Sequence, residues 1–233
     1  AQKLLLSLGV DDDVVDVLEQ AMPAKGTALR RIFKACYQFL VKFCLGNAEN
    51  QRELFESVGM LVGHISAESG ATELIMAVFR GNAELVTQLD RSLMIAIMTQ
   101  LSMNEEVDPD FVMFQFLASL CELDGRYQVL NQTMILNLLA DDSTGSLLLF
   151  GRGVERQERL PLMGGVKTLA DAPFKLRYHI GSIELLTICC EGDNVDAMTK
   201  AHNLISLDHI LLTLSEPSTC LLYTSDAADD SLR

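Results

Sequence analysis

The sequence has few prolines and few aromatic residues, and this scarcity bounds the fold class. Its 233 residues include 5 prolines, no tryptophan and only 6% aromatic residues. Leucine, methionine and alanine carry most of its 49% apolar content, and these residues favour helices over strands. A chain of this length can bury a sizeable core, so the composition predicts an all-α fold in one domain or one continuous array.

Basic charge is also scarce. The chain has 18 Lys and Arg against 32 Asp and Glu, which gives a net charge of −14. Duplex DNA and anionic membranes repel such a surface, so we expect no nucleic-acid partner. The basic cluster of Arg30, Arg31 and Lys34 is expected on the solvated face of its helix or in salt bridges between domains. Inositol-phosphate binding there is the weaker alternative.

Long apolar runs are absent. The longest, Leu74–Phe79 and Leu93–Met98, are far shorter than the ~20 residues of a membrane-spanning helix. The first residues do not resemble a signal peptide, and Leu4–Leu8 already has a helical pattern. We therefore expect no membrane contact by this segment, and we expect the chain to begin inside an element of a larger protein.

The cysteines do not form a disulfide or metal-binding pattern. They are scattered and have mostly apolar neighbours, which predicts free thiols, mostly buried, in a reducing compartment. On a helix, the adjacent Cys189 and Cys190 point about 100° apart, so one is expected to face inward and the other to lie at the edge. The six cysteines are Cys36, Cys44, Cys121, Cys189, Cys190 and Cys220.

Motifs of catalysis are missing as well. The sequence contains no nucleophile elbow, phosphate-binding glycine loop, dinucleotide fingerprint or His-Glu-x-x-His. Asp11–Asp13 lacks the glycine and distal glutamate of an EF-hand loop, and an acidic first turn explains it. Asp141-Asp142 is expected in a solvated loop. The histidines are far apart and are predicted to be surface or packing groups: His64, His179, His202 and His209. We therefore predict no enzyme, and no catalytic, cofactor or metal site residues.

Apolar spacings of three and four predict two strong helices. Thr27 is expected to cap the first, and Gly46 to end it. Its predicted inner face consists of Leu29, Ile32, Phe33, Cys36, Phe39, Leu40 and Phe43. Pro173 is expected to open the second, and Gly192 to end it. Its predicted inner face consists of Leu176, Ile180, Ile183, Leu186 and Cys190.

Caps and glycines predict the shorter helices. Gly59 is expected to break a helix that carries Leu54, Phe55 and Val58 on its inner face. By contrast, Leu85 to Leu101 at spacing four predicts one long helix. Asn131-Gln132-Thr133 fits a glycosylation acceptor but falls within a helical pattern. The remaining predictions are a helix from Asp12 to about Met22, helices over 72–79 and 127–139, a helix start at Asp108-Pro109, a turn at Asp124-Gly125, a cap after Gly81 at Asn82, and caps at Asn194 and Ser206.

About ten helices joined by short turns predict an armadillo- or HEAT-like α-solenoid of antiparallel helix pairs. No fixed period is visible, which disfavours tetratricopeptide and ankyrin repeats. The predicted organisation is a helical solenoid over 1–140, a surface loop with one short helix near 166–169 over 141–172, and further solenoid helices over 173–219. A strand over Leu147–Phe150 is possible within the loop. Residues 220–229 resemble a translated sequencing adapter, so 220–233 is predicted to be an artefact tail and the natural sequence to stop near Thr219.

Two segments carry a family resemblance. Residues 39–55, FLVKFCLGNAENQRELF, resemble the RIH domain, the homology domain of ryanodine and inositol-trisphosphate receptors. Residues 178–195, with Cys189-Cys190-Glu191-Gly192-Asp193-Asn194, are similar to a later stretch of inositol-trisphosphate receptors. The segments occur in the order found in the family. Asp193 departs from the family, which tends to have a basic residue there, and 151–172 follows its pattern least.

The resemblance implies a cytosolic armadillo-like solenoid between the ligand-binding region and the pore of a calcium-release channel. Such a channel is expected at the endoplasmic reticulum, with this segment on the cytosolic face and the full-length protein a homotetramer. The implied role is a non-catalytic scaffold that couples the two regions, with neighbouring domains of the same subunit as partners. A free-standing armadillo-like adaptor is the alternative, and an enzyme is the third possibility.

Overall fold

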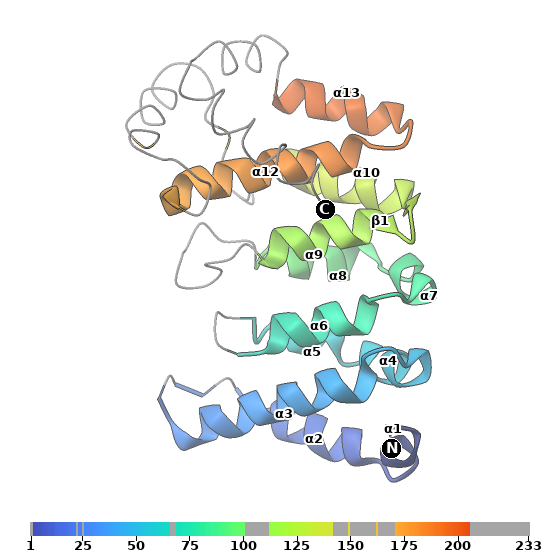
Figure 1. The fold of residues 1–233 in the computed structure, drawn as a ribbon, viewed down its shortest axis with the longest axis vertical. Helices are drawn as coiled ribbons and strands as arrows, with labels where there is room; N and C mark the ends of the chain where they lie inside the picture. The colour runs from blue at the N-terminus through green and yellow to red at the C-terminus, as the bar shows by residue number, and fades with distance from the viewer. Residues whose placement is uncertain are drawn as a thin grey trace.

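The computed structural model describes residues 2–21, 23–24, 26–65, 69–100, 112–141, 149, 162 and 171–205. These residues are mainly helical (Figure 1). The helices are α1 (Gln2–Ser7), α2 (Val10–Leu18), α3 (Ala28–Cys44), α4 (Ala48–Phe55), α5 (Val58–Val62), α6 (Ala71–Phe79), α7 (Ala83–Thr87), α8 (Arg91–Met98), α9 (Val112–Cys121), α10 (Val129–Ala140), α12 (Phe174–Cys190) and α13 (Val195–Leu204). One antiparallel pair, β1 (Glu122–Leu123) and β2 (Arg126–Tyr127), joins α9 to α10.

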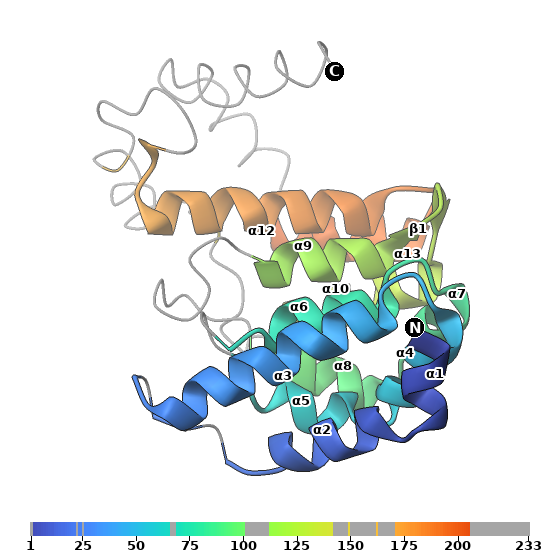
Figure 2. The same ribbon diagram turned by 60° about the horizontal axis from the view of Figure 1, so that its bottom comes forward.

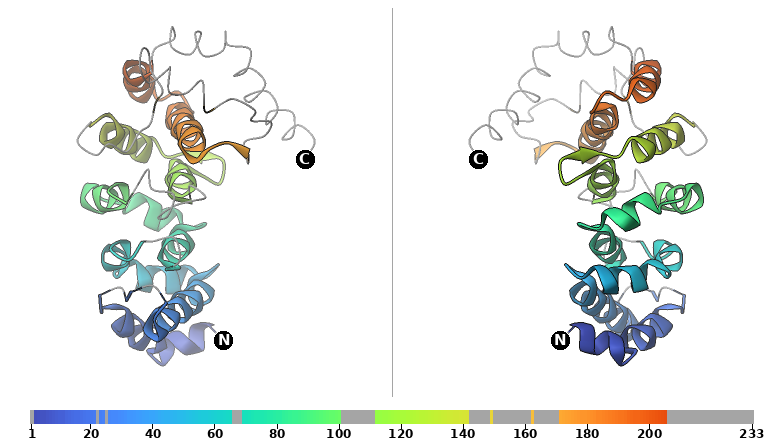
Figure 3. Two further views of the ribbon diagram at one scale, coloured as in Figure 1. Left: turned by 90° about the vertical axis from the view of Figure 1, so that its left-hand side faces the viewer. Right: turned by 90° about the vertical axis from the view of Figure 1, so that its right-hand side faces the viewer.

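The helices stack in layers that follow one another in chain order (Figure 3). The third helices of successive layers, α3, α6, α9 and α12, pack against one another along the stack. Each is followed by a short connection and by the first helix of the next layer, α4, α7, α10 or α13. The second helices, α2, α5 and α8, complete three-helix layers of the armadillo type. The all-α solenoid is confirmed, with three helices per layer where helix pairs were predicted.

Aromatic side chains pack both within a layer and between neighbouring layers. Phe79 on α6 lies 5.8 Å from Phe55 on α4 and 5.7 Å from Phe116 on α9, measured between ring centroids. Phe114 on α9 meets Tyr178 on α12 at 4.9 Å and nearly at right angles. Edge-to-face pairs of this kind contribute about 0.5–1.5 kcal/mol beyond the burial of their area. The core is therefore continuous across the layer boundaries.

Most capping predictions are confirmed. Thr27 caps α3 by accepting the N–H of Arg30 at 3.2 Å. Gly46 follows α3 in the left-handed conformation, at φ 71°, where glycine avoids the cost of a side chain. Asp124 and Gly125 both have positive φ, as a two-residue hairpin turn requires. The turn lies inside the β1–β2 hairpin, and for this reason α10 begins at Val129.

The predicted inner face of α3 is partly wrong, because the buried face is rotated relative to the predicted one. Leu29 and Ile32 are 40% and 51% exposed, whereas Tyr37 is fully buried. In Figures 1 and 2 the first turns of α3 extend past the start of α6, so they have no helix of the next layer to cover them. Tyr37 can be buried because its hydroxyl lies 2.7 Å from Nδ1 of His64, and a satisfied hydroxyl removes most of the desolvation cost.

The predicted long helix from Leu85 is also wrong, because Asp90 divides it into α7 and α8. The Asp90 carboxylate accepts the N–H of Leu93 and the hydroxyl of Ser92, both at 2.7 Å. These hydrogen bonds lower the pKa of Asp90. A carboxylate that captures a backbone N–H in this way starts a new helix, and here it outweighs the apolar spacing.

Two further boundaries differ from the predictions. Gly59 lies inside α5, and the break falls before Val58. A glycine costs a helix about 1 kcal/mol, and burial of Val58 and of Leu61 offsets it. The cap of α2 is Gly9 in the left-handed conformation; Asp12 lies in the first turn, and the helix ends at Leu18.

Several predictions lie outside the described residues. They are the helix start at Asp108-Pro109, the strand over Leu147–Phe150, the helix near 166–169, the cap at Ser206 and the tail over 220–233. The division into 1–140, 141–172 and 173–219 therefore stays a prediction. Among the residues that the structure does describe, no helix has the length and apolar character needed to cross a membrane.

The contact between Tyr37 and His64 predicts a pH-dependent stability. Burial, and to a lesser degree the charge of Arg30, lower the pKa of His64. As the pH falls below about 6.5, His64 is therefore protonated in the unfolded chain before it is protonated in the folded chain. The free energy of unfolding therefore decreases toward acidic pH. We expect the urea midpoint to fall between pH 7 and 5, and less steeply in His64→Gln. Equal slopes in the two proteins would show that His64 does not contribute.

Candidate functional site: glutamine clasps at the helix ends

A buried glutamine joins the ends of two helices in the second layer. Gln51 on α4 is 2% exposed, and its Nε2 donates to the carbonyls of Ala77, at 2.8 Å, and Arg80, at 3.0 Å, at the end of α6. Asn82 donates to Oε1 of Gln51 at 3.1 Å and caps α7 by accepting the N–H of Leu85. The last carbonyls of a helix have no partner within it. We name this arrangement a glutamine clasp.

The same arrangement recurs at the end of α12. Gln132 on α10 is fully buried, and its Nε2 donates to the carbonyls of Ile188, at 2.9 Å, and Glu191, at 3.0 Å. Asn194 donates to Oε1 of Gln132 at 3.1 Å and accepts the N–H of Ala197. The partners correspond one for one to those of the α4–α6 clasp. The fold therefore repeats a polar contact as well as a helix arrangement.

A simpler version holds the end of α3. Gln2 on α1 donates from Nε2 to the carbonyls of Lys42, at 2.7 Å, and Leu45, at 3.3 Å. A Gly-Asn pair, Gly46-Asn47, follows, as Gly81-Asn82 follows the α6 clasp. In each clasp the first helix of a layer thus binds the end of the third helix of the same layer.

The asparagine that precedes each buried glutamine binds the preceding layer, whereas the glutamine binds its own layer. Nδ2 of Asn50 donates to the carbonyl of Phe43 at 2.8 Å, at the end of α3. Nδ2 of Asn131 donates to Leu120 at 3.0 Å, at the end of α9, and to Val86 at 3.2 Å, on α7. Each Asn-Gln pair therefore connects two layers: the asparagine binds the preceding layer, and the glutamine binds the third helix of its own layer. Asn131 is 5% exposed, which excludes it as a glycosylation acceptor in the folded chain.

The α7–α9 layer lacks the clasp. Val86 stands four residues after the cap Asn82, the place that Gln51 and Gln132 hold after their caps. The end of α9 is instead continued by the β1–β2 hairpin, where the N–H of Gln128 donates to the carbonyl of Cys121 at 2.7 Å. The hairpin supplies backbone contacts where the other layers use a glutamine.

The hairpin in turn packs on the connection after α12. The ring of Tyr127 lies against Gly192, so closely that a side chain at Gly192 would overlap it. The Tyr127 hydroxyl donates to Glu191 at 3.2 Å, and the charge of this carboxylate raises the pKa of Tyr127. Gly192 is therefore required both by its φ of 74° and by the approach of this ring.

The histidines that the structure describes do not lie together. His64 contacts Tyr37, His179 is 1% exposed within α12, and His202 is exposed on α13; His209 lies outside the described residues. Within the part of the chain that the structure describes, no group of three or more His, Cys, Asp or Glu side chains could hold a metal ion. The prediction that the chain has no catalytic or cofactor residue stays a prediction.

The acidic and basic candidates are dispersed. Asp11 is buried and its pKa is raised by that burial, while Asp12 and Asp13 are exposed. Arg30 is half-buried and donates from Nη1 to the carbonyl of Pro23 at 3.1 Å. Arg31 and Lys34 are exposed.

The described cysteines are free thiols. Cys44, Cys121 and Cys189 are buried, and the sulfurs of Cys121 and Cys189 lie 3.7 Å apart. The prediction that Cys190 faces inward is corrected, because Cys190 is half-buried and Cys189 takes the inner position. The neighbouring thiol and burial raise the pKa of Cys189, so it stays protonated and unreactive at neutral pH. Cys36 is half-buried, and Cys220 lies outside the described residues.

Sequence reasoning missed the clasps although a signal was present. The dipeptide Asn-Gln occurs at 50–51 and 131–132, and each pair precedes a glycine and a capping asparagine. The distance from glutamine to cap is 31 residues in one clasp and 62 in the other. A repeat with one fixed period would show the same separation in both clasps. Here the separation doubles, because residues inserted between glutamine and cap lengthen the chain while the hydrogen bond between them is kept.

Removal of a clasp glutamine should destabilise the chain. Gln132→Ala leaves two part-buried carbonyls and the Asn194 amide without this partner, and each loss costs about 1 kcal/mol. We expect a loss of roughly 3 kcal/mol in urea unfolding. Gln38→Ala is the control, because Gln38 is exposed on α3. Equal effects of the two substitutions would contradict the structural role of the clasp.

Two glycines provide a matched pair. Gly192→Ala meets the Tyr127 ring, whereas Gly81→Ala, with a similar φ of 68°, meets nothing within 4 Å. Both substitutions carry the strain of a left-handed alanine, about 1 kcal/mol, and we expect Gly192→Ala to cost clearly more in thermal unfolding. Tyr127→Ala should remove the difference. If the two alanine variants unfold alike, the hairpin does not constrain this connection.

The amino-acid sequence of this chain is similar to sequences of known proteins. Residues 2–150 match the family model of the RIH domain. The chain is 31% identical over 116 residues to inositol 1,4,5-trisphosphate receptor-like protein A of Dictyostelium discoideum, covering 48% of this chain and 4% of that protein. It is 26% identical over 223 residues to inositol 1,4,5-trisphosphate receptor itr-1 of Caenorhabditis elegans, covering 90% of this chain and 8% of that protein. The chain thus spans less than a tenth of either relative.

Proposed function

Because the chain belongs to the RIH domain family, we propose that it is a coupling segment of an inositol-trisphosphate-gated calcium-release channel. One relative is named an inositol 1,4,5-trisphosphate receptor and another an inositol 1,4,5-trisphosphate receptor-like protein. The resemblance of residues 39–55 and 178–195 supports the same proposal. In this role the segment transmits conformational change between the ligand-binding and pore regions of a much longer subunit.

The repeated clasp is the observation that carries the proposal. Apolar contacts have no directional preference, whereas hydrogen bonds to the carbonyls at a helix end define both distance and direction. Asn131 extends such bonds from α10 to both α7 and α9, and Arg52 on α4 meets Glu84 on α7 at 2.8 Å. A solenoid whose layers are joined in this way turns a small rotation of one layer into a displacement further along the stack.

Partners and location follow from the same role. The partners are neighbouring domains of the same subunit, in a homotetrameric channel of the endoplasmic reticulum, and the segment lies on the cytosolic face. The proposal assigns no catalysis to the segment. The stability of its helix ends, rather than a reactive group, is the property on which the function depends.

The test uses the full-length subunit, expressed in cells that lack other inositol-trisphosphate receptors. Gln132→Ala should raise the ligand concentration needed for half-maximal calcium release, with ligand binding by the amino-terminal region retained. Gln38→Ala, on the exposed face of α3, should release calcium like the wild type. Unchanged release by Gln132→Ala, at equal expression and with a demonstrated loss of local stability, would overturn the coupling role.

A further inference from the structure

The clasps show which positions in the first helices of successive layers are equivalent. At one of these positions α10 has an exposed leucine where the other helices have an acidic residue. The caps Asn47, Asn82, Gln128 and Asn194 precede the first residues of α4, α7, α10 and α13. The second residue after the cap is acidic in three of these helices: Glu49, Glu84 and Asp196. In α10 this residue is Leu130, which is 84% exposed. An isolated exposed leucine is common, so its neighbours decide whether it has a meaning.

Other exposed apolar residues lie at the starts of the two helices that meet near Leu130. Nδ2 of Asn194 lies 3.5 Å from the carbonyl of Val129 and 3.3 Å from Oγ1 of Thr133, which places the first turns of α10 and α13 side by side. Val129 is 48% exposed and Val195 is 69% exposed. At the equivalent position, directly after the cap, α4 and α7 carry only alanine. We name as the apolar patch the exposed residues Tyr127, Val129, Leu130, Val195 and Met198.

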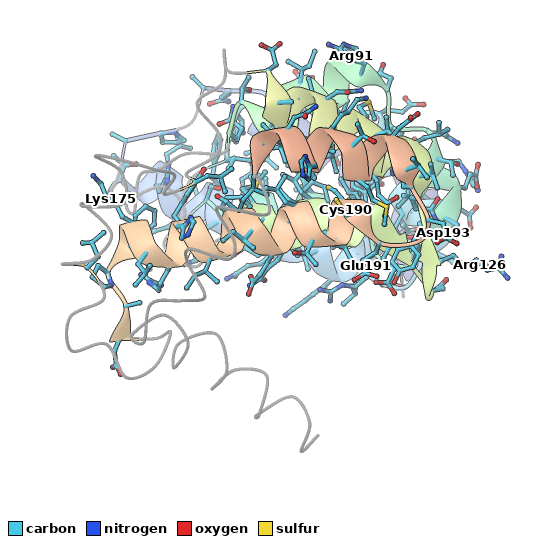
Figure 4. The ribbon with its side chains drawn as sticks, turned by 90° about the horizontal axis from the view of Figure 1, so that it is seen from above. Arg91, Arg126, Lys175, Cys190, Glu191 and Asp193 are labelled. Carbon is cyan, nitrogen blue, oxygen red and sulfur yellow. The ribbon has the colours of Figure 1, made fainter. Side chains whose placement is uncertain are left out.

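The surroundings of the apolar patch are acidic. Figure 4 shows Glu191 and Asp193 together at this end of the molecule, with Arg126 of the hairpin beside them. Glu122 pairs with Tyr127 across the hairpin, and Tyr127 contacts Glu191. The exposed acidic residues of the hairpin, of the connection after α12 and of the first turn of α13 are Glu122, Asp124, Glu191, Asp193 and Asp196, and the hairpin carries one arginine, Arg126. An apolar centre with a charged rim is the usual composition of a protein-binding surface.

We propose that the apolar patch is a docking site for a basic amphipathic helix of a partner protein. Such a helix presents leucine-type side chains on one face and Lys or Arg on the other. The apolar face covers Leu130 and its neighbours, and the basic residues meet the acidic rim, which favours this partner over acidic ones. The same rim repels anionic lipid headgroups. The inference does not depend on the proposed coupling role.

A model peptide tests the site on the 233-residue chain. The probe is a fluorescein-labelled peptide of leucine and lysine with the spacing of an amphipathic helix, and fluorescence anisotropy measures its Kd. Leu130→Glu restores the acidic residue of the other layers and favours the first turn of a helix, so the chain stays folded. It should weaken binding by about tenfold or more, although the added negative charge alone would strengthen it.

Leu8→Glu is the matched control, because Leu8 is 66% exposed and the change in charge is the same. We expect it to leave the Kd unchanged, and we expect Val195→Glu to act like Leu130→Glu. Equal or tighter binding by Leu130→Glu overturns the proposal, and so does an equal loss in both leucine variants. Equal affinity for a leucine–glutamate peptide overturns the charge complementarity. Binding to phosphatidylcholine vesicles but not to the peptide would indicate a membrane site instead.

Discussion

The carbonyl groups at the ends of the stacked helices impose the constraint on which this solenoid depends. A helix leaves its last carbonyls unpaired, and in a stack these ends lie partly inside the protein, where an unpaired polar group is costly. Gln51 and Gln132 satisfy them from the first helix of the layer, and the capping asparagines complete the contact. The short connections can therefore turn sharply at the surface, while the carbonyls at the helix ends keep a hydrogen-bond partner.

This constraint also explains why one layer differs from the others. Where Val86 replaces the glutamine, the chain does not turn directly into the next helix but forms the β1–β2 hairpin. The hairpin then packs its Tyr127 ring on Gly192 of the following clasp. The helix that follows the hairpin, α10, opens with Val129 and Leu130, where α4 and α7 open with alanine and glutamate. The missing clasp and the apolar patch thus occur at the same connection.

Local chemistry made much of the fold predictable. Caps such as Thr27 and Asn194, and glycines such as Gly46, act on their immediate neighbours, so their effect can be recognised without the fold. The wrong predictions concern contacts between layers. Burial of Tyr37 depends on His64, and exposure of Ile32 depends on where α6 begins, and neither is a property of α3 alone.

The sequence by itself determined the all-α class, the position of most helices and the relationship to the RIH domain family. These depend on composition, short-range periodicity and local motifs. Only the tertiary structure decided which side chains join the layers. The Nε2 atom of Gln132 reaches carbonyls more than fifty residues away in the chain, and the residues between can change in number while the contact is kept. A pairing of this kind is defined by distance in space, so no spacing along the chain predicts it.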